Sequence, residues 1–324
     1  MDRRTIKPRH VILILIALGV SAYVFGQLLY GHVLRRLGAW SWMELVVLYF
    51  GGVLLMFVPS YRFLRRSGCH LRFSGFTAVM LASQAVNLVT PLRMGFPVRV
   101  YLFQRRYDVP ISTGTLLIPL EMFMGVLTNA CLALVFAGWM EGMGSHRAID
   151  GLLAISGILG LAAFFAVRRS RTGRPLAPSG TPRRLVMLLE SLRPALSHVA
   201  CGTLVLFASL YAMNTVVGAG ILRIAAEGAG FEKPIGWLIG AWAAAYLTGL
   251  ISLLPQGLGV RDASLAWILH TGGAAPGQVV GIVLLVRLVV TGFPLVAGLL
   301  AWLGLSLSPV SNPEIVKNRS GTLP

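Results

Sequence analysis

Long apolar runs separated by short polar segments dominate the pattern along this chain. Several of the runs reach the ~20 residues that an α-helix needs to cross the hydrocarbon core of a membrane. The pattern predicts an all-α, polytopic membrane helix bundle with about seven to eight spanning helices. The expected spans are residues 11–33, 44–63, 111–139, 151–167, 199–222, 235–254 and 278–307.

Two further apolar stretches, Phe76–Val89 and Ala263–Leu269, are too short to cross comfortably and lie beside Pro and Gly residues. Backbone broken by Pro and Gly is tolerated at membrane depth only where protein or a water-filled cavity satisfies the freed polar groups. Interrupted segments of this kind are pointers to the binding site of a transporter. We therefore expect two short re-entrant or broken segments that form one site. The expected helix breaks are Pro91, Gly95, Pro255, Gly257 and Gly259.

The two halves of the chain share a spacing that indicates a weak internal repeat. In each half a Pro is followed four residues later by a Gly, as Pro91 by Gly95 and Pro255 by Gly259. A further Pro then opens the next span in both halves.

Glu121 and Arg287 are the only acidic or basic residues deep inside the strong spans. Glu121 lies eleven residues after Pro110, and Arg287 lies eleven residues after Pro276. Eleven residues of helix extend ~16 Å, about half of the ~30 Å hydrocarbon thickness. A lone charge at this depth costs ~2.5–3.5 kcal/mol on insertion scales, so each residue should face the protein interior. The matched depths predict an intramembrane charge pair near a pseudo-symmetry axis, with a role either in transport or in structure alone.

Three arginines, Arg93, Arg99 and Arg261, lie at the expected helix breaks. Two interpretations stay open for them. They extend toward the membrane surface as ordinary flanking arginines do, or they combine with exposed helix N-termini to bind phosphate. In the second case Asn87 adds a neutral donor. Asp262 then either orients Arg261 or caps the following short helix.

Composition agrees with a membrane protein, because 56% of the 324 residues are hydrophobic and 12% are charged. A soluble domain carries about 25% charged residues. The formal net charge of +17 would suggest a nucleic-acid partner in a soluble protein. Between membrane spans, basic residues are instead the ordinary signal for the cytoplasmic side, so we expect no nucleic acid. This signal places the N-terminus, residues 62–72 and residues 168–193 in the cytoplasm.

The chain is expected to form one membrane domain, residues 1–307, followed by a polar tail, residues 308–324. Inside the domain, residues 168–196 form a basic cytoplasmic loop with seven arginines and one glutamate. Its second half is either an amphipathic helix on the membrane surface or a plain loop.

The sequence contains no recognisable catalytic, metal or cofactor site. Its three cysteines form no CxxC pair, and its six histidines stand singly. The Gly257–Gly259 stretch lacks the third Gly of a dinucleotide fingerprint. We therefore expect no enzyme activity, no metal and no cofactor.

At the residues named above, the sequence resembles the transmembrane region of lysylphosphatidylglycerol synthases and their free-standing flippase-like relatives. The resemblance extends over most of the chain, about residues 11–307. It departs from the family pattern where Gln256 replaces a Gly, where Asp262 replaces a Glu, and at Met122 and Gly125. The matching residues are Asn87, Pro91, Arg93, Gly95, Arg99, Glu121, Pro255, Gly257, Gly259, Arg261, Asp262 and Arg287.

The resemblance implies a multi-pass protein of a bacterial inner membrane that moves a phosphate-bearing lipid between leaflets, or assists that movement. The lipid would be a phospholipid, a polyprenyl-phosphate-linked lipid or a hopanoid lipid. No soluble synthase domain follows the spans, so aminoacyl transfer is not expected. The alternative is a non-transporting scaffold for a lipid- or glycan-modifying membrane enzyme. A continuous cavity lined by Glu121 and the arginines would favour transport, and a dry core would favour the scaffold.

Overall fold

Helices make up all the regular secondary structure in the computed structural model, which describes residues 37–90, 94–140, 201–251, 257 and 259–307. The expected all-α class is confirmed. The expected spans 11–33 and 151–167, the basic loop and the tail lie outside the described residues. The helices are α3 (Ala39–Arg66), α4 (Phe73–Val89), α5 (Gly95–Tyr107), α6 (Ile111–Val135), η2 (Ala137–Met140), α9 (Cys201–Gly228), α10 (Ile235–Ile251), α11 (Val260–Thr271), α12 (Pro276–Arg287), η4 (Leu288–Gly292) and α13 (Phe293–Leu307).

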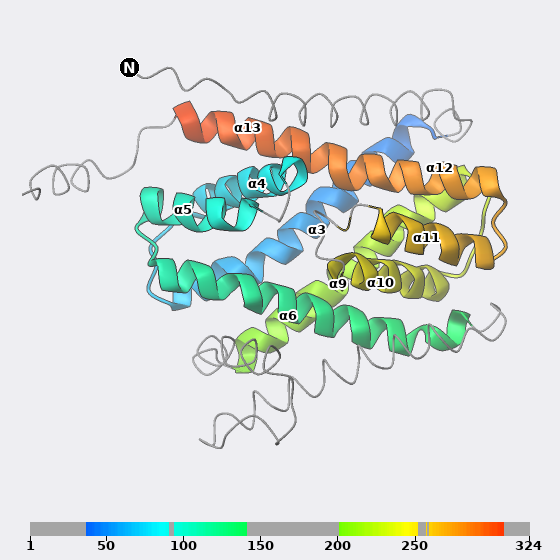
Figure 1. Ribbon diagram of the computed structural model, residues 1–324, viewed down its shortest axis with the longest axis horizontal. Helices are drawn as coiled ribbons and strands as arrows, with labels where there is room; N and C mark the ends of the chain where they lie inside the picture. Colours follow the sequence, from blue (N-terminus) through cyan, green and yellow to red (C-terminus); the bar gives the residue numbers. More distant parts are fainter. Residues whose placement is uncertain (1–36, 91–93, 141–200, 252–256, 258, 308–324) are drawn as a thin grey trace, which may run out of the picture.

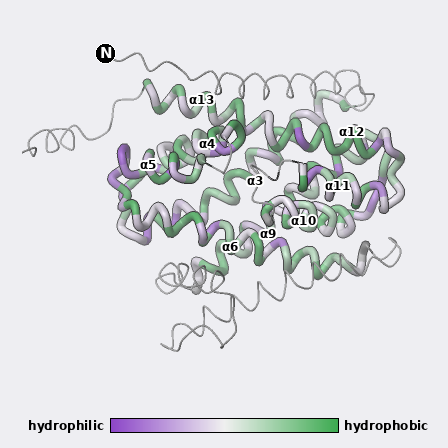
Figure 2. The backbone as a smooth tube through the Cα atoms, viewed as in Figure 1, coloured by the Kyte–Doolittle hydropathy of each residue, from purple (hydrophilic) through white to green (hydrophobic). Residues whose placement is uncertain are grey.

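Four helical segments of the described chain are long and apolar enough to cross a membrane. They are Ala39–Arg66, Ile111–Val135, Gly202–Gly228 and Pro276–Leu307, with mean hydropathies between 1.7 and 2.5. In Figure 1, α6 and α12–α13 run along opposite sides of the bundle, and α3 and α9 lie obliquely between them. Figure 2 shows these helices as mainly hydrophobic, with hydrophilic residues toward the two ends and at a few central positions.

The last long segment contains a π-helical turn, η4, between α12 and α13. Pro294 follows this turn and is buried inside α13. A proline ring clashes with the carbonyl four residues earlier, here that of Val290 within η4, so the wider π-turn accommodates the ring without a break. The helix therefore continues through Pro294 as one segment from Pro276 to Leu307.

Helices α4 and α5 form a re-entrant hairpin. A Cβ atom on Gly75, in the first turn of α4, would overlap the Tyr107 hydroxyl at the end of α5. The chain therefore leaves the bundle on the side where it entered. The break between the two helices contains Pro91 and Arg93, which lie outside the described residues, and α5 begins at Gly95.

Helices α10 and α11 form a second re-entrant hairpin. A Cβ atom on Gly272, just after α11, would lie 2.5 Å from the Trp237 ring near the start of α10. The prediction that residues 235–254 cross the membrane is therefore wrong, because α10 has 17 residues and the chain returns through α11. An apolar run indicates that a helix is removed from water, but it does not show whether protein or lipid surrounds the helix. Protein surrounds α10 on nearly all sides.

The internal repeat is clearer in the structure than in the sequence. Helices α3, α4, α5 and α6 have 28, 17, 13 and 25 residues. Helices α9, α10 and α11 have 28, 17 and 12, and the final crossing segment has 32. Equivalent packings recur, because α4 packs on α13 as α10 packs on α6.

The two repeats have inverted topology. Arg66, at the end of α3, donates a hydrogen bond to the Thr203 hydroxyl at the start of α9, so these equivalent helices are antiparallel. The two hairpins therefore enter from opposite ends of the bundle and meet near its middle, as Figure 1 shows with α4–α5 on the left and α10–α11 on the right. Inverted repeats with discontinuous helices are typical of secondary transporters.

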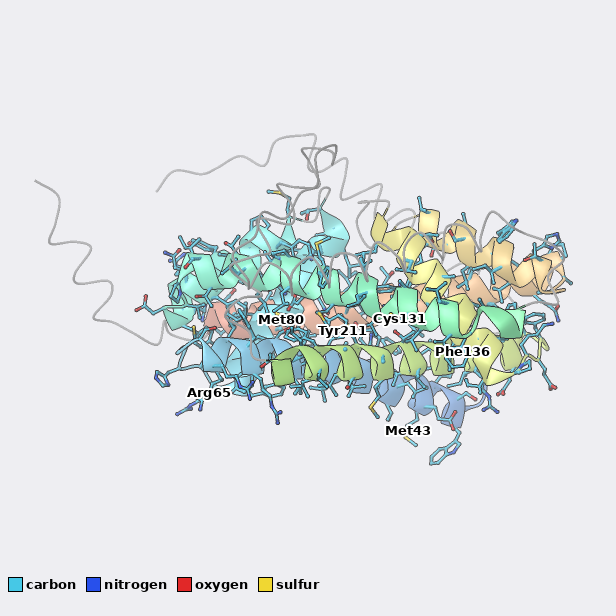
Figure 3. All side chains as sticks on the ribbon, turned by 90° about the horizontal axis from the view of Figure 1, so that it is seen from below. Met43, Arg65, Met80, Cys131, Phe136 and Tyr211 are labelled. Carbon is cyan, nitrogen blue, oxygen red and sulfur yellow. The ribbon has the colours of Figure 1, made fainter. Side chains whose placement is uncertain are left out.

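Contacts between helix ends define two faces of the bundle. On the first, called the Arg66 face, Arg66 meets Thr203, and Arg106 donates to the Leu305 carbonyl oxygen. On the second, called the Gln278 face, the Gln278 amide nitrogen donates to the Ala229 carbonyl oxygen across 3.0 Å. Figure 3 shows the two ends of the bundle, with Arg65 near one and Phe136 near the other.

Candidate functional site

A cavity of about 250 Å³ lies where the two hairpins meet. Every described helix from α3 to α13 except α12 and the short η2 contributes to its wall. Among the residues that the structure describes, three charged ones line it: Arg99 from α5, Glu121 from α6 and Arg261 from α11. Asn87, Trp242 and Tyr246 add polar and aromatic surface. The cavity therefore brings together residues from both of the broken segments that the sequence singled out.

Arg99 is held by an ion pair inside the bundle. Its Nη1 lies 2.7 Å from Glu121 Oε2, and the two side chains are 4% and 13% exposed. The Ser60 hydroxyl donates to the other Glu121 oxygen across 2.6 Å. Arg99 Nε and Nη2 are buried and have no hydrogen-bond partner among the described residues. Two donors thus hold the Glu121 carboxylate, and two nitrogens of Arg99 keep unused donor capacity inside the bundle.

Arg261 has aromatic rather than acidic neighbours. It is 6% exposed, and its guanidinium carbon lies 4.6 Å from the centre of the Trp242 ring and 5.7 Å from that of Tyr246. Cation–π contact of this kind stabilises a desolvated guanidinium. Arg261 forms no ion pair with any acidic residue that the structure describes.

Gly95 allows the first hairpin to close tightly. Its backbone N–H donates to Asn87 Oδ1 across 2.7 Å, which gives the start of α5 a side-chain partner. A Cβ atom on Gly95 would overlap the Ser83 carbonyl oxygen and lie 2.5 Å from Asn87 Oδ1. The Asn87 oxygen is therefore used as a helix cap, although its side chain still lines the cavity.

Gly257 plays the same part in the second hairpin. Its φ of 67° is in the left-handed region, and a Cβ atom there would lie 2.6 Å from Gly249 Cα. A Cβ atom on Gly249 would in turn lie 2.8 Å from Arg261 Cβ. This close packing fixes Arg261 against α10 and beside the cavity.

These contacts align the two repeats residue by residue. Gly95 and Gly257 each pack on the preceding helix, and they differ by 162 in number (257 − 95). Arg99 and Arg261 differ by the same 162 (261 − 99). The correspondence of Gly95 with Gly259 suggested by the sequence is therefore wrong, because Gly259 has open space around it and makes no equivalent contact.

Asp262 and Arg287 form a second ion pair, with 3.5 Å between Arg287 Nη1 and Asp262 Oδ1. The other Asp262 oxygen accepts a 3.3 Å hydrogen bond from the Gly259 N–H and so caps α11. Asp262 therefore partners Arg287 and the helix start, and its ion pair does not involve Arg261. Neither Asp262 nor Arg287 lines the cavity.

The predicted pairing of Glu121 with Arg287 is wrong. Glu121 pairs with Arg99 of the preceding hairpin, and Arg287 pairs with Asp262 of its own preceding hairpin. The spacing from proline gives the depth of each charge in its helix, but it carries no information about the direction in which the side chain points. Both ion pairs form within a repeat, and neither joins the two repeats.

Several residues of the site were not singled out from the sequence. Ser60, Trp242 and Tyr246 contact the charged groups directly. Trp242 and Tyr246 are four residues apart on one helix, and this spacing places both on one face. The sequence alone could therefore have indicated this aromatic pair. Of the expected site residues, Pro91, Arg93 and Pro255 lie outside the described residues. Within the described ranges no group of three His, Cys, Asp or Glu residues could hold a metal ion.

Comparison with known proteins gives one match to a family. No curated protein matches the sequence. The family model described as the lysylphosphatidylglycerol synthase TM region matches residues 11–298. This range includes both hairpins, the cavity and both ion pairs, and the chain belongs to the lysylphosphatidylglycerol synthase transmembrane-region family.

Proposed function

We propose that this membrane protein moves a phosphate-bearing lipid between the two leaflets of a bacterial inner membrane. The lipid's head group occupies the cavity between the hairpins while its tails stay in the bilayer. The observation that carries the proposal is the cavity lined by Arg99, Glu121 and Arg261. A scaffold protein has no need of a hollow with buried charges at its centre, so this arrangement favours transport over the scaffold alternative.

The cavity addresses the main energetic problem of lipid translocation. Moving an unpaired charge into a low-dielectric medium costs on the order of tens of kcal/mol. Guanidinium groups at the cavity wall replace part of the hydration of a phosphate, and their planar donors match its oxygens. Arg99 has two buried nitrogens without partners among the described residues, and these supply such donors.

The inverted repeat supports the same proposal. The two hairpins enter from opposite ends, so a movement of one repeat against the other opens the cavity alternately to each leaflet. The chain carries no nucleotide-binding motif, so transport proceeds down a lipid gradient or is coupled to an ion. Glu121 is the candidate proton carrier, because it is a carboxylate inside a spanning helix and faces the cavity.

The proposal is tested with the purified full chain in phosphatidylcholine vesicles that contain a trace of fluorescent phosphatidylglycerol or fluorescent polyprenyl phosphate. Leaflet exchange is read from the fraction of fluorescence that a membrane-impermeant reductant quenches. We expect exchange of at least one lipid to exceed that of protein-free vesicles. We also expect Arg261→Met to abolish the excess and Arg223→Gln, on an exposed ion pair, to retain it. Exchange equal to that of empty vesicles for both lipids would reject the proposal.

A further inference from the structure

The equivalent arginines of the two repeats differ in how their charges are balanced. Arg99 and Arg261 are both buried and both line the cavity. Glu121 lies 2.7 Å from Arg99 and balances its charge. In the second repeat Asp262, the acid that follows Arg261, lies 3.5 Å from Arg287 and does not line the cavity. Arg261 therefore has no acidic partner among the described residues.

The charges of the described cavity wall can be counted directly. Two arginines and one glutamate line it, which gives a formal charge of +1 (2 − 1). Asp262 and Arg287 cancel each other within their own ion pair. The excess charge belongs to Arg261, and the Trp242 and Tyr246 rings hold its guanidinium without neutralising it.

A described cavity wall of charge +1 matches a ligand of charge −1. A zwitterionic head group brings its own cation, which leaves Arg261 unbalanced. A phosphate monoester carries nearly two negative charges, so one of them is left unbalanced in a low-dielectric cavity. Uncompensated buried charge is costly in both cases.

We propose that the cavity selects a singly anionic phosphodiester head group, and that Arg261, which has no acidic partner in the described part of the chain, sets this selection. The inference rests on the proposed function only for the statement that the ligand is a transported lipid. The charge preference itself is a property of the cavity and is measurable by equilibrium binding. Glu121 then has a second part in the site, since it holds the cavity charge at +1 rather than +2.

The test measures binding of short-chain lipids to the detergent-solubilised full chain at pH 8 by calorimetry. The probes are dioctanoyl forms of phosphatidylglycerol, phosphatidylcholine and phosphatidic acid. Diethyl phosphate, which is singly anionic and has no lipid tails, distinguishes a lipid head group from a free phosphodiester. We expect phosphatidylglycerol to bind about ten- to hundredfold more tightly than phosphatidylcholine, the range of one charge-assisted hydrogen bond. We also expect it to bind more tightly than phosphatidic acid.

The variants test the charge count. Arg261→Met lowers the cavity charge to zero and should remove the preference for phosphatidylglycerol over phosphatidylcholine. Glu121→Gln raises the charge to +2 and should move the preference toward phosphatidic acid. The double variant Arg99→Gln with Glu121→Gln restores +1 and should again prefer phosphatidylglycerol, which keeps the test valid where a single variant fails to fold. Arg223→Gln is the matched control outside the cavity.

Two results would overturn the inference. One is equal binding of phosphatidylglycerol and phosphatidylcholine by the unaltered protein. The other is a double variant that has lost the preference as completely as Arg261→Met. Charge-selective binding without leaflet exchange would refute the proposed transport and leave the inference standing. Leaflet exchange without charge-selective binding would refute the charge selection and leave the proposed transport standing.

Discussion

The Arg99 guanidinium and the Glu121 carboxylate meet at 2.7 Å and connect the first re-entrant hairpin to the long helix that follows it. Removing one partner of a buried pair leaves the other charge unpaired and typically costs ~3–5 kcal/mol. We expect Arg99→Gln and Glu121→Gln each to lower the free energy of unfolding by about this amount. The double variant should lose less than the sum, because two neutral amides can bond to each other. Unfolding by SDS titration in mixed micelles provides the measurement.

A solvent-exposed ion pair provides the control for this unfolding experiment. Arg223 and Glu227 form an ion pair on α9 with side chains that are 59% and 48% exposed. Replacing Arg223 with Gln should leave the unfolding midpoint unchanged, because solvent screens such a pair. Strictly additive losses for Arg99 and Glu121 would show that these two residues do not meet in the folded protein.

Asp262 and Arg287 should be coupled to each other and independent of Glu121. We expect Asp262→Asn and Arg287→Gln to be non-additive in the free energy of unfolding, because their side chains are 28% and 14% exposed and only 3.5 Å apart. Glu121→Gln and Arg287→Gln should add within about 0.5 kcal/mol, because each residue pairs within its own repeat. Coupling between Glu121 and Arg287 would instead support the pairing that the prolines suggested.

The sequence predicts well those features that depend on composition along the chain. The first re-entrant segment was predicted correctly because Pro and Gly residues interrupt the apolar run at Thr90–Gly95. For the second, the break before Val260 was predicted, but the helix that precedes it, α10, was assigned as a span. The sequence left open whether Arg99 and Arg261 extend toward the membrane surface, and the structure shows both of them buried. Lipid and protein interior are equally apolar, however, so the sequence could not show that α10 lies inside the bundle rather than across it.

The partners of the charged residues could not be predicted, because they depend on the direction of each side chain. Glu121 and Arg287 have matching depths, yet Glu121 points to α5 and Arg287 points to α11. The alignment of the two repeats could not be predicted either, because it depends on contacts between helices. Prolines suggest one alignment, whereas the glycines that touch the neighbouring helix, Gly95 and Gly257, define another.

Gly95 should be intolerant of any side chain. Its Cβ would overlap the Ser83 carbonyl oxygen, which belongs to the helix backbone and has little room to move. We expect Gly95→Ala to lower the thermal midpoint and the yield of monodisperse protein by size-exclusion chromatography. Gly51→Ala is the matched control, because a Cβ there meets nothing within 4 Å. That control should be neutral or stabilise the protein by up to about 1 kcal/mol, the helix propensity gained. Equal behaviour of the two variants would show that the hairpin is not closed as described.

The Arg66 face should be cytoplasmic, because the two faces of the bundle carry different charges. The described residues of the Arg66 face include Arg62, Arg65, Arg66, Arg72, Arg105 and Arg106 and the single acid Asp108. The Gln278 face has Arg223 and Lys233 against Glu44, Glu227 and Glu232. Basic residues in short loops remain on the cytoplasmic side during insertion.

Cysteine labelling of intact cells in a cysteine-free background tests this orientation. His70 and Glu232 are both exposed, and they lie in the loops of the Arg66 face and the Gln278 face respectively. We expect an impermeant maleimide to label Glu232→Cys from outside and to label His70→Cys only after the cells are permeabilised. Ser179→Cys, in the basic segment outside the described residues, should behave like His70→Cys if the seven arginines hold that segment in the cytoplasm. External labelling at Ser179→Cys would overturn the cytoplasmic placement of that segment. Labelling of His70→Cys from outside, with none at Glu232→Cys, would show that the bundle has the opposite orientation in the membrane.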